Sequence, residues 1–194
     1  MLAVRIKTFY KEHLGLDDDQ LITRLAEISR GEAVKKGRRM ISMGEQVEGL
    51  PILVTGVLRG FVVDESGRDI TDCFIHQKGD AIIGCGRLDE PSTIHIEAIT
   101  DCQIVIIPVA ALLQMMEEPG LLRLYNHQLT EALRRHWQMK MQMYQGDAMT
   151  RYQWFLKTYP GLEEQVSGKH LASYLGMTPV TLSRLRRKLR EAAE

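Results

Sequence analysis

Apolar and polar positions follow two different periods along this chain. In residues 16–30, Leu21, Leu25 and Ile28 recur at the spacing of a helix face. Aspartates precede them at positions 17–19, where the positive end of a helix dipole favours carboxylates. From about residue 32 to 109 the apolar runs are short, and turn signals separate them. We therefore predict a helix at 16–30 and, after it, a sandwich or barrel of several strands.

Four apolar runs mark the predicted strands. They lie at residues 52–63, 69–75, 94–99 and 102–108. The stretch FVVDESGRDITDCFI predicts one β-hairpin, because Ser66 and Gly67 stand between two strand-like runs and glycine suits a tight turn. The strand pattern stops after Pro108, so we expect the β region to end there.

Helical periodicity returns beyond Pro108. The run VAALLQMM predicts a short helix, and residues 121–145 predict a long one because they lack internal proline and glycine. Gly146 is a natural stop for that helix. Asp147 and Pro160 then bound another predicted helix, whose apolar face consists of Tyr152, Phe155, Leu156 and Tyr159.

The long helix carries an apolar seam at intervals of three and four residues, the pattern of a two-stranded coiled coil. Such a stripe packs either on its own domain or along the same helix of a second copy, and the heptad spacing favours the second. The methionines of this helix need no cofactor, because thioether side chains fill irregular packing. The predicted seam residues are Leu122, Tyr125, Leu129, Ala132, His136, Met139 and Met143.

The C-terminal stretch contains the signals of two short helices joined by a tight turn. Ser167 and Thr178 suit N-caps, Pro179 suits a first helical position, and Gly176 permits a left-handed turn. Apolar contacts of the second helix are expected from Leu182, Leu185 and Leu189, and the opposite face from Val180, Ser183, Arg184 and Arg187, flanked by Arg186, Lys188 and Arg190. Together these signals predict a helix-turn-helix. The alternative is a basic helix that closes a bundle.

Charge is balanced over the chain, with 25 basic and 25 acidic residues, but it is unevenly distributed. Residues 147–194 hold eight Lys or Arg against five Asp or Glu, which predicts a basic module joined to an acidic remainder. The three cysteines form no CxxC pair, so we predict neither a disulfide framework nor a metal site. The sequence shows no signal peptide and no apolar run of membrane-spanning length, so we expect a cytoplasmic protein without a membrane partner. It shows no HExxH motif, Walker loop or Ser/His/Asp set, so we expect no enzyme.

Residues 15–194 resemble the Crp-Fnr transcription regulators in the stretches KKGRRMISMGE (35–45), LRGFVVDESGRDIT (58–71), KGDAIIG (78–84) and YPGLEEQVSGKHLASYLGMTPVTLSRLRRKL (159–189). The resemblance implies an α+β fold with three parts. These are a sensor domain at 1–116, a double-stranded β-helix or jelly roll of the cyclic-nucleotide-binding type; a dimerisation helix at 117–146; and a winged-helix-like helix-turn-helix domain at 147–194. The implied partners are double-stranded DNA, a second copy of the chain and RNA polymerase.

The same resemblance assigns roles within the helix-turn-helix. Base readers fall on Pro179, Val180, Ser183 and Arg184, and a phosphate contact falls on Thr181. Among these, Arg184 keeps the chemistry for bidentate readout of guanine. The full set of expected DNA-binding residues is Lys169, Thr178, Pro179, Val180, Thr181, Ser183, Arg184 and Arg187.

The resemblance also exposes an altered ligand cassette. The family holds a cyclic nucleotide with Gly-Glu followed by Arg-Ser or Arg-Thr, whereas this chain reads GCGRLDEPST, with Cys85 in place of Glu and Ser92 in place of Arg. An anionic phosphate without its arginine is poorly held, so we expect no cyclic AMP binding. We predict no cofactor and leave the effector unassigned. The implied pocket residues are Gly84, Cys85, Arg87, Ser92, Thr93, Met139 and Lys140.

The sequence also allows a second functional hypothesis. It is a ligand-binding or scaffold protein whose helix-turn-helix contacts protein rather than DNA. That reading predicts no salt-dependent affinity for DNA and no effect of Arg184→Ala on DNA binding.

Overall fold

The structure is a computed structural model that describes residues 2–84 and 87–192. The chain forms two compact units. The first runs to Gly60 and resumes with Ile75–Ala132, and the second contains Phe61–Phe74 and the residues from Leu133 onward. A segment from the middle of the sequence therefore belongs to the same unit as the C-terminal helices.

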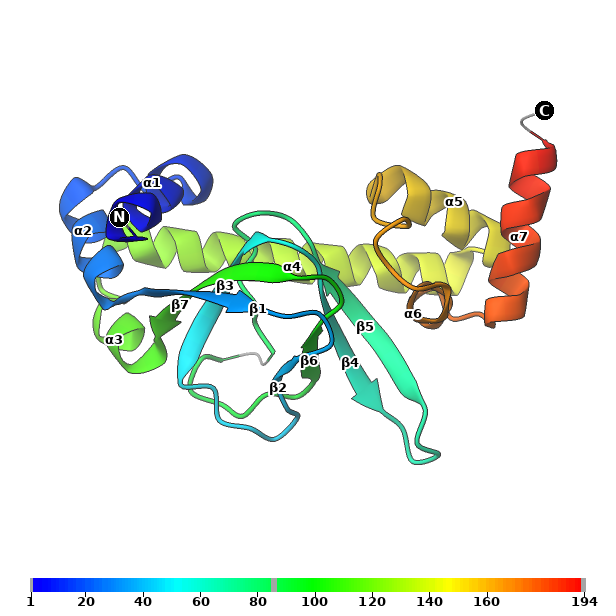
Figure 1. The fold of residues 1–194 in the computed structure, drawn as a ribbon, viewed down its shortest axis with the longest axis horizontal. Helices are drawn as coiled ribbons and strands as arrows, with labels where there is room; N and C mark the ends of the chain where they lie inside the picture. The colour runs from blue at the N-terminus through cyan, green and yellow to red at the C-terminus, as the bar shows by residue number, and fades with distance from the viewer. Residues whose placement is uncertain (1, 85–86, 193–194) are drawn as a thin grey trace. The chain divides into compact units, whose positions relative to one another are not determined.

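Helices and strands follow one another as Figure 1 labels them. The helices are α1 (Leu2–Leu14), α2 (Asp19–Ile28), α3 (Val109–Gln114), α4 (Pro119–Gln145), α5 (Ala148–Thr158), α6 (Gly168–Tyr174) and α7 (Pro179–Glu191). The strands are β1 (Arg30–Val34), β2 (Arg39–Ile41), β3 (Gly49–Thr55), β4 (Leu58–Val63), β5 (Asp69–Ile75), β6 (His95–Ala98) and β7 (Cys102–Pro108). None of the described helices is both long and apolar enough to cross a membrane.

Two sheets build the jelly-roll-like part of the fold (Figure 1). One has the order β1-β7-β3, and β7 pairs antiparallel with both neighbours, for example through Val105 opposite Ile52. The other has the order β2-β6-β4-β5, which leaves β5 at an edge. Helices α1, α2 and α3 and the start of α4 add to one apolar core with β3 and β7, and Tyr10, Leu25 and Leu121 are among its buried residues.

Several predicted elements are confirmed with small shifts of their bounds. The hairpin of β4 and β5 turns at Gly67, and α3, α4 and α5 lie within a few residues of their predicted ranges. The apolar run at 52–63 is two strands, because Gly56 has a φ of 101° and its Cα approaches the Asp101 carbonyl so closely that a Cβ would lie 2.6 Å from the oxygen. Ile28 was expected on the buried face of α2, but it is exposed.

Helix α1 was not predicted, although its buried residues Ile6, Phe9 and Tyr10 stand at helical spacing. The predicted domain boundaries after residues 116 and 146 stay a prediction. The two compact units divide α4 between Ala132 and Leu133.

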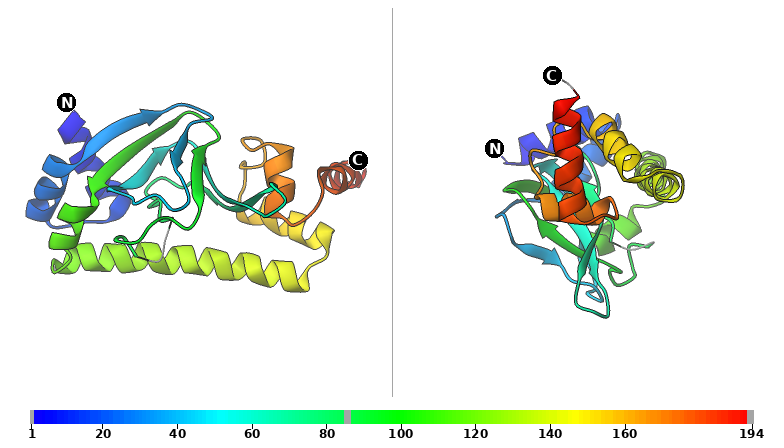
Figure 2. Two further views of the ribbon diagram at one scale, coloured as in Figure 1. Left: turned by 90° about the horizontal axis from the view of Figure 1, so that it is seen from below. Right: turned by 90° about the vertical axis from the view of Figure 1, so that its right-hand side faces the viewer.

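Aromatic rings form the core of the second unit. Phe74 from β5 lies 5.1 Å from Tyr174 of α6 and 6.4 Å from Phe155 of α5, measured between ring centroids. Tyr159 lies 5.1 Å from Phe155, and its hydroxyl is 3.2 Å from that of Tyr174. Helix α7 packs against α5 and α6 (Figure 2), and Leu182 anchors it with 1% of its surface exposed. In the described part of the chain, no strand follows α5.

Candidate nucleic-acid interface

The turn between α6 and α7 is built by side chains that the sequence singles out. The Ser167 hydroxyl accepts a hydrogen bond from the backbone N–H of His170 at 3.1 Å, and the Thr178 hydroxyl accepts one from Thr181 at 3.1 Å. Both residues therefore cap their helices as expected. Gly176 has a φ of 60°, in the left-handed region that favours glycine. Pro179 begins α7, where its missing N–H leaves no helical bond unmade.

Helix α7 separates an anchored side from an exposed side. Leu182 is fully buried, whereas Leu185 and Leu189 are only half-buried. Val180 is 60% exposed, which is high for a large apolar side chain in a folded domain. The exposed side also presents Pro179, Ser183, Arg184 and Arg187. This arrangement matches the face expected for contact with a partner.

Arg186 differs from the expectation that it flanks this face. Its Nε donates to Glu163 Oε1 at 2.7 Å, and the Tyr152 hydroxyl donates to the same carboxylate oxygen at 2.7 Å. Burial, together with the hydrogen bond to Glu163, raises the pKa of Tyr152 to about 12. Arg186 therefore links α7 to the loop before α6 and to α5, which fixes the helix in place. This role was not visible in the sequence because Glu163 lies 23 residues earlier.

Lys169 and Thr181 have partners within the second unit. Lys169 is largely exposed, and its Nζ lies 3.6 Å from the Asp69 carboxylate of β5. The hydroxyls of Thr181 and Thr178 are 2.9 Å apart, next to the first turn of α7. Arg187 pairs with Glu191 at 3.6 Å along α7. These pairs are exposed, and such pairs contribute little to stability.

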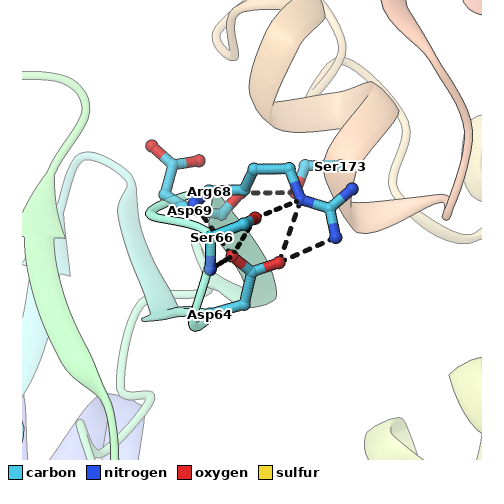
Figure 3. A network of polar contacts seen from close by, with 5 residues as sticks. All are labelled: Asp64, Ser66, Arg68, Asp69 and Ser173. Atoms are coloured by element: carbon cyan, nitrogen blue, oxygen red, sulfur yellow. Dashed lines mark hydrogen bonds and ion pairs between the residues drawn. The ribbon is translucent and has the colours of Figure 1, made fainter.

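Figure 3 shows the hairpin held against α6. The backbone N–H of Thr71 donates to the Ser173 hydroxyl at 2.9 Å, which in turn donates to the Asp69 carbonyl at 3.4 Å. At the tip, Asp64 accepts hydrogen bonds from Ser66 and Arg68, and these bonds hold the pKa of its carboxyl below the usual range. Ser173 of α6 thus bonds the backbone of the edge strand β5, a contact that the sequence did not predict.

The described residues of the loop expected to hold a ligand form hydrogen bonds and an ion pair with one another. Gly84 is buried, and its carbonyl accepts hydrogen bonds from the hydroxyls of Ser92, at 3.3 Å, and Thr93, at 2.8 Å. Arg87 is exposed and forms a two-pronged pair with Asp89, at 2.9 and 2.7 Å. The structure therefore gathers Gly84, Ser92 and Thr93 but turns Arg87 to a neighbouring carboxylate. Of the remaining predicted pocket residues, Cys85 lies outside the described residues.

The other two predicted pocket residues, Met139 and Lys140, belong to the second unit, on α4. The Lys140 ammonium lies 4.9 Å from the centroid of the Trp137 ring and 5.7 Å from that of Tyr144, within reach of a cation–π interaction. Met139 is half-buried. Lys140 thus covers part of an aromatic surface on the helix.

The predicted seam of α4 is only partly exposed. Leu122, His136 and Met143 are exposed, whereas Tyr125, Leu129, Ala132 and Met139 are half-buried. Three large exposed side chains lie outside the predicted set: Leu133 at 58%, Trp137 at 50% and Tyr144 at 72%. With Leu122 they fall within an arc of about 60° at about 100° per residue. We define these four residues as the α4 stripe. A count of exposed apolar residues at helical spacing, rather than strict heptads, finds it.

Comparisons with known proteins agree with this architecture. Residues 32–119 match the family model of the cyclic nucleotide-binding domain. A search of curated protein sequences found no match. The fold is similar to that of FixK2 from Bradyrhizobium japonicum, with a TM-score of 0.75 and 21% identity over 86% of each chain.

Two further solved structures show the same similarity. The c-di-GMP-responsive global regulator CLP from Xanthomonas campestris has a TM-score of 0.74 at 16% identity, over 91% of this chain and 93% of that one. TTHB099, a transcriptional regulator of the CRP family from Thermus thermophilus, has a TM-score of 0.68 at 19% identity, over 84% and 85%. Residues 32–119 thus match the cyclic nucleotide-binding domain family, within a chain that has the fold of Crp/Fnr transcription regulators.

Proposed function

We propose that this protein is a homodimeric transcription regulator of the Crp-Fnr type that binds specific DNA sequences through α7. The observation that carries the proposal is the exposed face of α7. The buried Leu182 and the N-cap Thr178 hold the helix, and Ser183, Arg184 and Arg187 are left facing outward. The similarity in fold to known regulators supports the same conclusion.

The chemistry of this face suits the major groove of DNA. Arg184 offers a planar fork that matches the two acceptors of guanine, and each such pair is worth about 1–3 kcal/mol of discrimination. Pro179, Val180 and Ser183 lie in the first turns of α7, where a recognition helix meets base edges. Lys169, Thr178, Thr181 and Arg187 offer donors for phosphate oxygens, which set the position of the protein without reading sequence.

A gel-shift assay against genomic fragments tests the proposal, with the full chain and increasing salt. We expect one tightly bound site and an affinity that falls steeply with salt. Arg184→Ala should lower the affinity for that site and relax the preference at one base pair. Arg187→Ala should lower the affinity for all sequences alike, and it should reduce the slope of log affinity against log salt concentration by about one.

Arg5→Ala is the matched control, because Arg5 is an exposed arginine of α1 in the other unit. It removes the same charge and should leave the specific site unchanged. Equal and weak binding of all sequences would refute the regulator, and it would favour a scaffold whose helix-turn-helix contacts protein.

The sensor domain, we propose further, does not bind cyclic AMP. The support is the state of the loop: the Ser92 and Thr93 hydroxyls bond the Gly84 carbonyl, and Arg87 is paired with Asp89. A phosphate would have to break these bonds to recruit either hydroxyl or the guanidinium. Calorimetric titration of the full chain with cyclic AMP should show no heat of binding, and a micromolar or tighter complex would contradict this.

Self-association is the remaining part of the proposal, with a second copy of the chain as the occupant of the α4 stripe. The stripe is apolar along a helix of 27 residues, and it adjoins seam positions that already follow the coiled-coil period. Two copies bound about 34 Å apart would place both recognition helices in successive major grooves of a palindromic site. RNA polymerase is the partner that such a regulator would address once bound to DNA.

A further inference from the structure

Three different metal-binding side chains meet between strand β5 and helix α4 in the second unit. Asp72 and Cys73 are neighbours on β5, and His136 lies on α4. One ligand atom of each residue lies within 4.8 Å of the other two. The distance between His136 Nε2 and Asp72 Oδ2 is 3.8 Å. The set therefore supplies one sulfur, one nitrogen and one oxygen donor at a single place.

The topology explains how consecutive residues reach the same point. Side chains alternate between the two faces of a strand, so Asp72 and Cys73 would normally diverge. Strand β5 is the outermost strand of its sheet, however, and side chains from both faces can reach around an edge. His136 approaches from 63 residues further along the chain, which is why the spacing of cysteines in the sequence gave no sign of the site.

The donor set selects the kind of ion. Zinc and the softer transition-metal ions prefer thiolate and imidazole ligands, whereas calcium and magnesium prefer oxygen ligands. At the usual bond lengths, a tetrahedral zinc ion holds neighbouring ligand atoms about 3.4–3.8 Å apart. The nitrogen and oxygen ligand atoms belong at the short end of this range, so the 3.8 Å between His136 and Asp72 and the outer limit of 4.8 Å both shorten by side-chain rotation at a half-exposed place.

We propose that Asp72, Cys73 and His136 bind one Zn²⁺ ion and leave its fourth position to water. Binding breaks the S–H bond of Cys73 and forms a bond from the sulfur to the metal, and the proton passes to solvent. Three protein ligands with an open position distinguish this site from closed structural zinc sites.

The surroundings leave room for the ion and its fourth ligand. A cavity of about 400 Å³ lies beside Asp72 and His136, and its other lining residues are Leu133, Trp137, Met139 and Lys140. Lys140 carries a positive charge that opposes a cation, but the Trp137 ring holds its ammonium at 4.9 Å. The negative charges of the Asp72 carboxylate and the Cys73 thiolate together offset the charge of the ion.

A bound ion would link strand β5 to helix α4 within the second unit. Strand β5 also bonds Ser173 of α6, so an ion that fixes β5 to α4 fixes the support of the helix-turn-helix. This consequence rests on the proposed function, and it makes specific DNA binding depend on zinc. Zinc binding itself does not rest on that function.

Titration of the full chain with Co²⁺ tests the site, because cobalt takes zinc sites and its bond to thiolate gives a strong near-ultraviolet band. We expect one equivalent of Co²⁺ per chain, displacement by Zn²⁺, and release of one proton. Cys73→Ser should abolish the band, and Asp72→Asn and His136→Gln should each weaken binding at least about 10-fold. Cys102→Ser is the control and should keep the band.

Two outcomes would overturn the site: the absence of a band in a folded wild-type chain, and a band that survives Cys73→Ser. Either would mean that Asp72, Cys73 and His136 are neighbours that hold no metal ion. The same samples, tested by gel shift with zinc or with a chelator, separate the two proposals. A cobalt band without specific DNA binding supports the zinc site and refutes the regulator. Specific DNA binding without a cobalt band supports the regulator and refutes the zinc site.

Discussion

A single residue sets the geometry of the turn before α7. Gly176 has a φ of 60°, and Gly161 has a φ of 76° in the loop before α6. Alanine at either position costs about 1–2 kcal/mol, because the left-handed conformation brings Cβ against the backbone. We expect Gly161→Ala and Gly176→Ala to lower the free energy of unfolding by this amount in chemical denaturation.

The two glycines differ in one respect, which supplies the control. A Cβ at Gly161 meets nothing within 4 Å, whereas a Cβ at Gly176 meets the terminal methyl of Met143. Gly176→Ala should therefore also displace Met143, and Met143→Ala should rescue part of the loss at Gly176 only. An unchanged stability of Gly176→Ala would show that the turn does not need its observed backbone.

A buried ion pair is the other residue-scale feature with a clear consequence. Arg59 is 2% exposed, and its Nη2 lies 2.7 Å from Glu97 Oε1. Removal of Glu97 takes a charge-assisted hydrogen bond from a buried guanidinium, at a cost of about 1.5–3 kcal/mol. We expect Glu97→Ala to lower the unfolding free energy by that much. Lys11→Ala, which breaks the exposed pair with Asp19, should cost less than about 1 kcal/mol.

At the scale of elements, a heptad count on α4 identifies the apolar helix but not which of its faces is most exposed. The count found an apolar helix but centred its seam on Tyr125, Ala132 and Met139, which are half-buried in the chain's own fold. The α4 stripe, which is exposed, is rotated toward Leu133 and Trp137. We expect Trp137→Glu to shift the chain from dimer to monomer in analytical ultracentrifugation, because a charge would be buried in the interface.

Gln138→Glu is the matched control for this prediction. It adds the same charge to the next residue, about 100° further round the helix and outside the α4 stripe. A dimer that survives Trp137→Glu would place the interface elsewhere than on the stripe.

The elements that the sequence predicts well are those with local signals. Ser167, Gly176 and Thr178 act within a few residues, so the caps and the turn of the helix-turn-helix were read correctly. The sequence shows that the ligand loop lacks the Glu and Arg of the family's cassette. It does not predict the pairing of Arg87 with Asp89. Arg186 was misjudged because its partner Glu163 is remote in sequence.

At the scale of the whole molecule, the long-range contacts escape prediction for a physical reason. Ser173 is 102 residues from Thr71, and His136 is 63 from Cys73, and no periodicity encodes such pairs. The hairpin of β4 and β5 lies within the range predicted for the sensor domain. Its residue Phe74 nevertheless packs in the core of the C-terminal helices. The family model spans this hairpin, because it covers residues 32–119.

This division of the chain predicts which helices respond to a core substitution. Phe74 is 7% exposed, and its ring contacts Tyr174 and Phe155, so Phe74→Ala should cost about 3–5 kcal/mol. We expect the loss to appear as faster amide hydrogen exchange in α5 and α6, although residue 74 lies in the β-rich part of the sequence. Leu53→Ala, at a fully buried position in the first unit, should speed exchange in β3 and β7 instead. Equal effects of both variants on α5 would mean that the two units unfold as one, and the hairpin would then have no separate role in supporting the C-terminal helices.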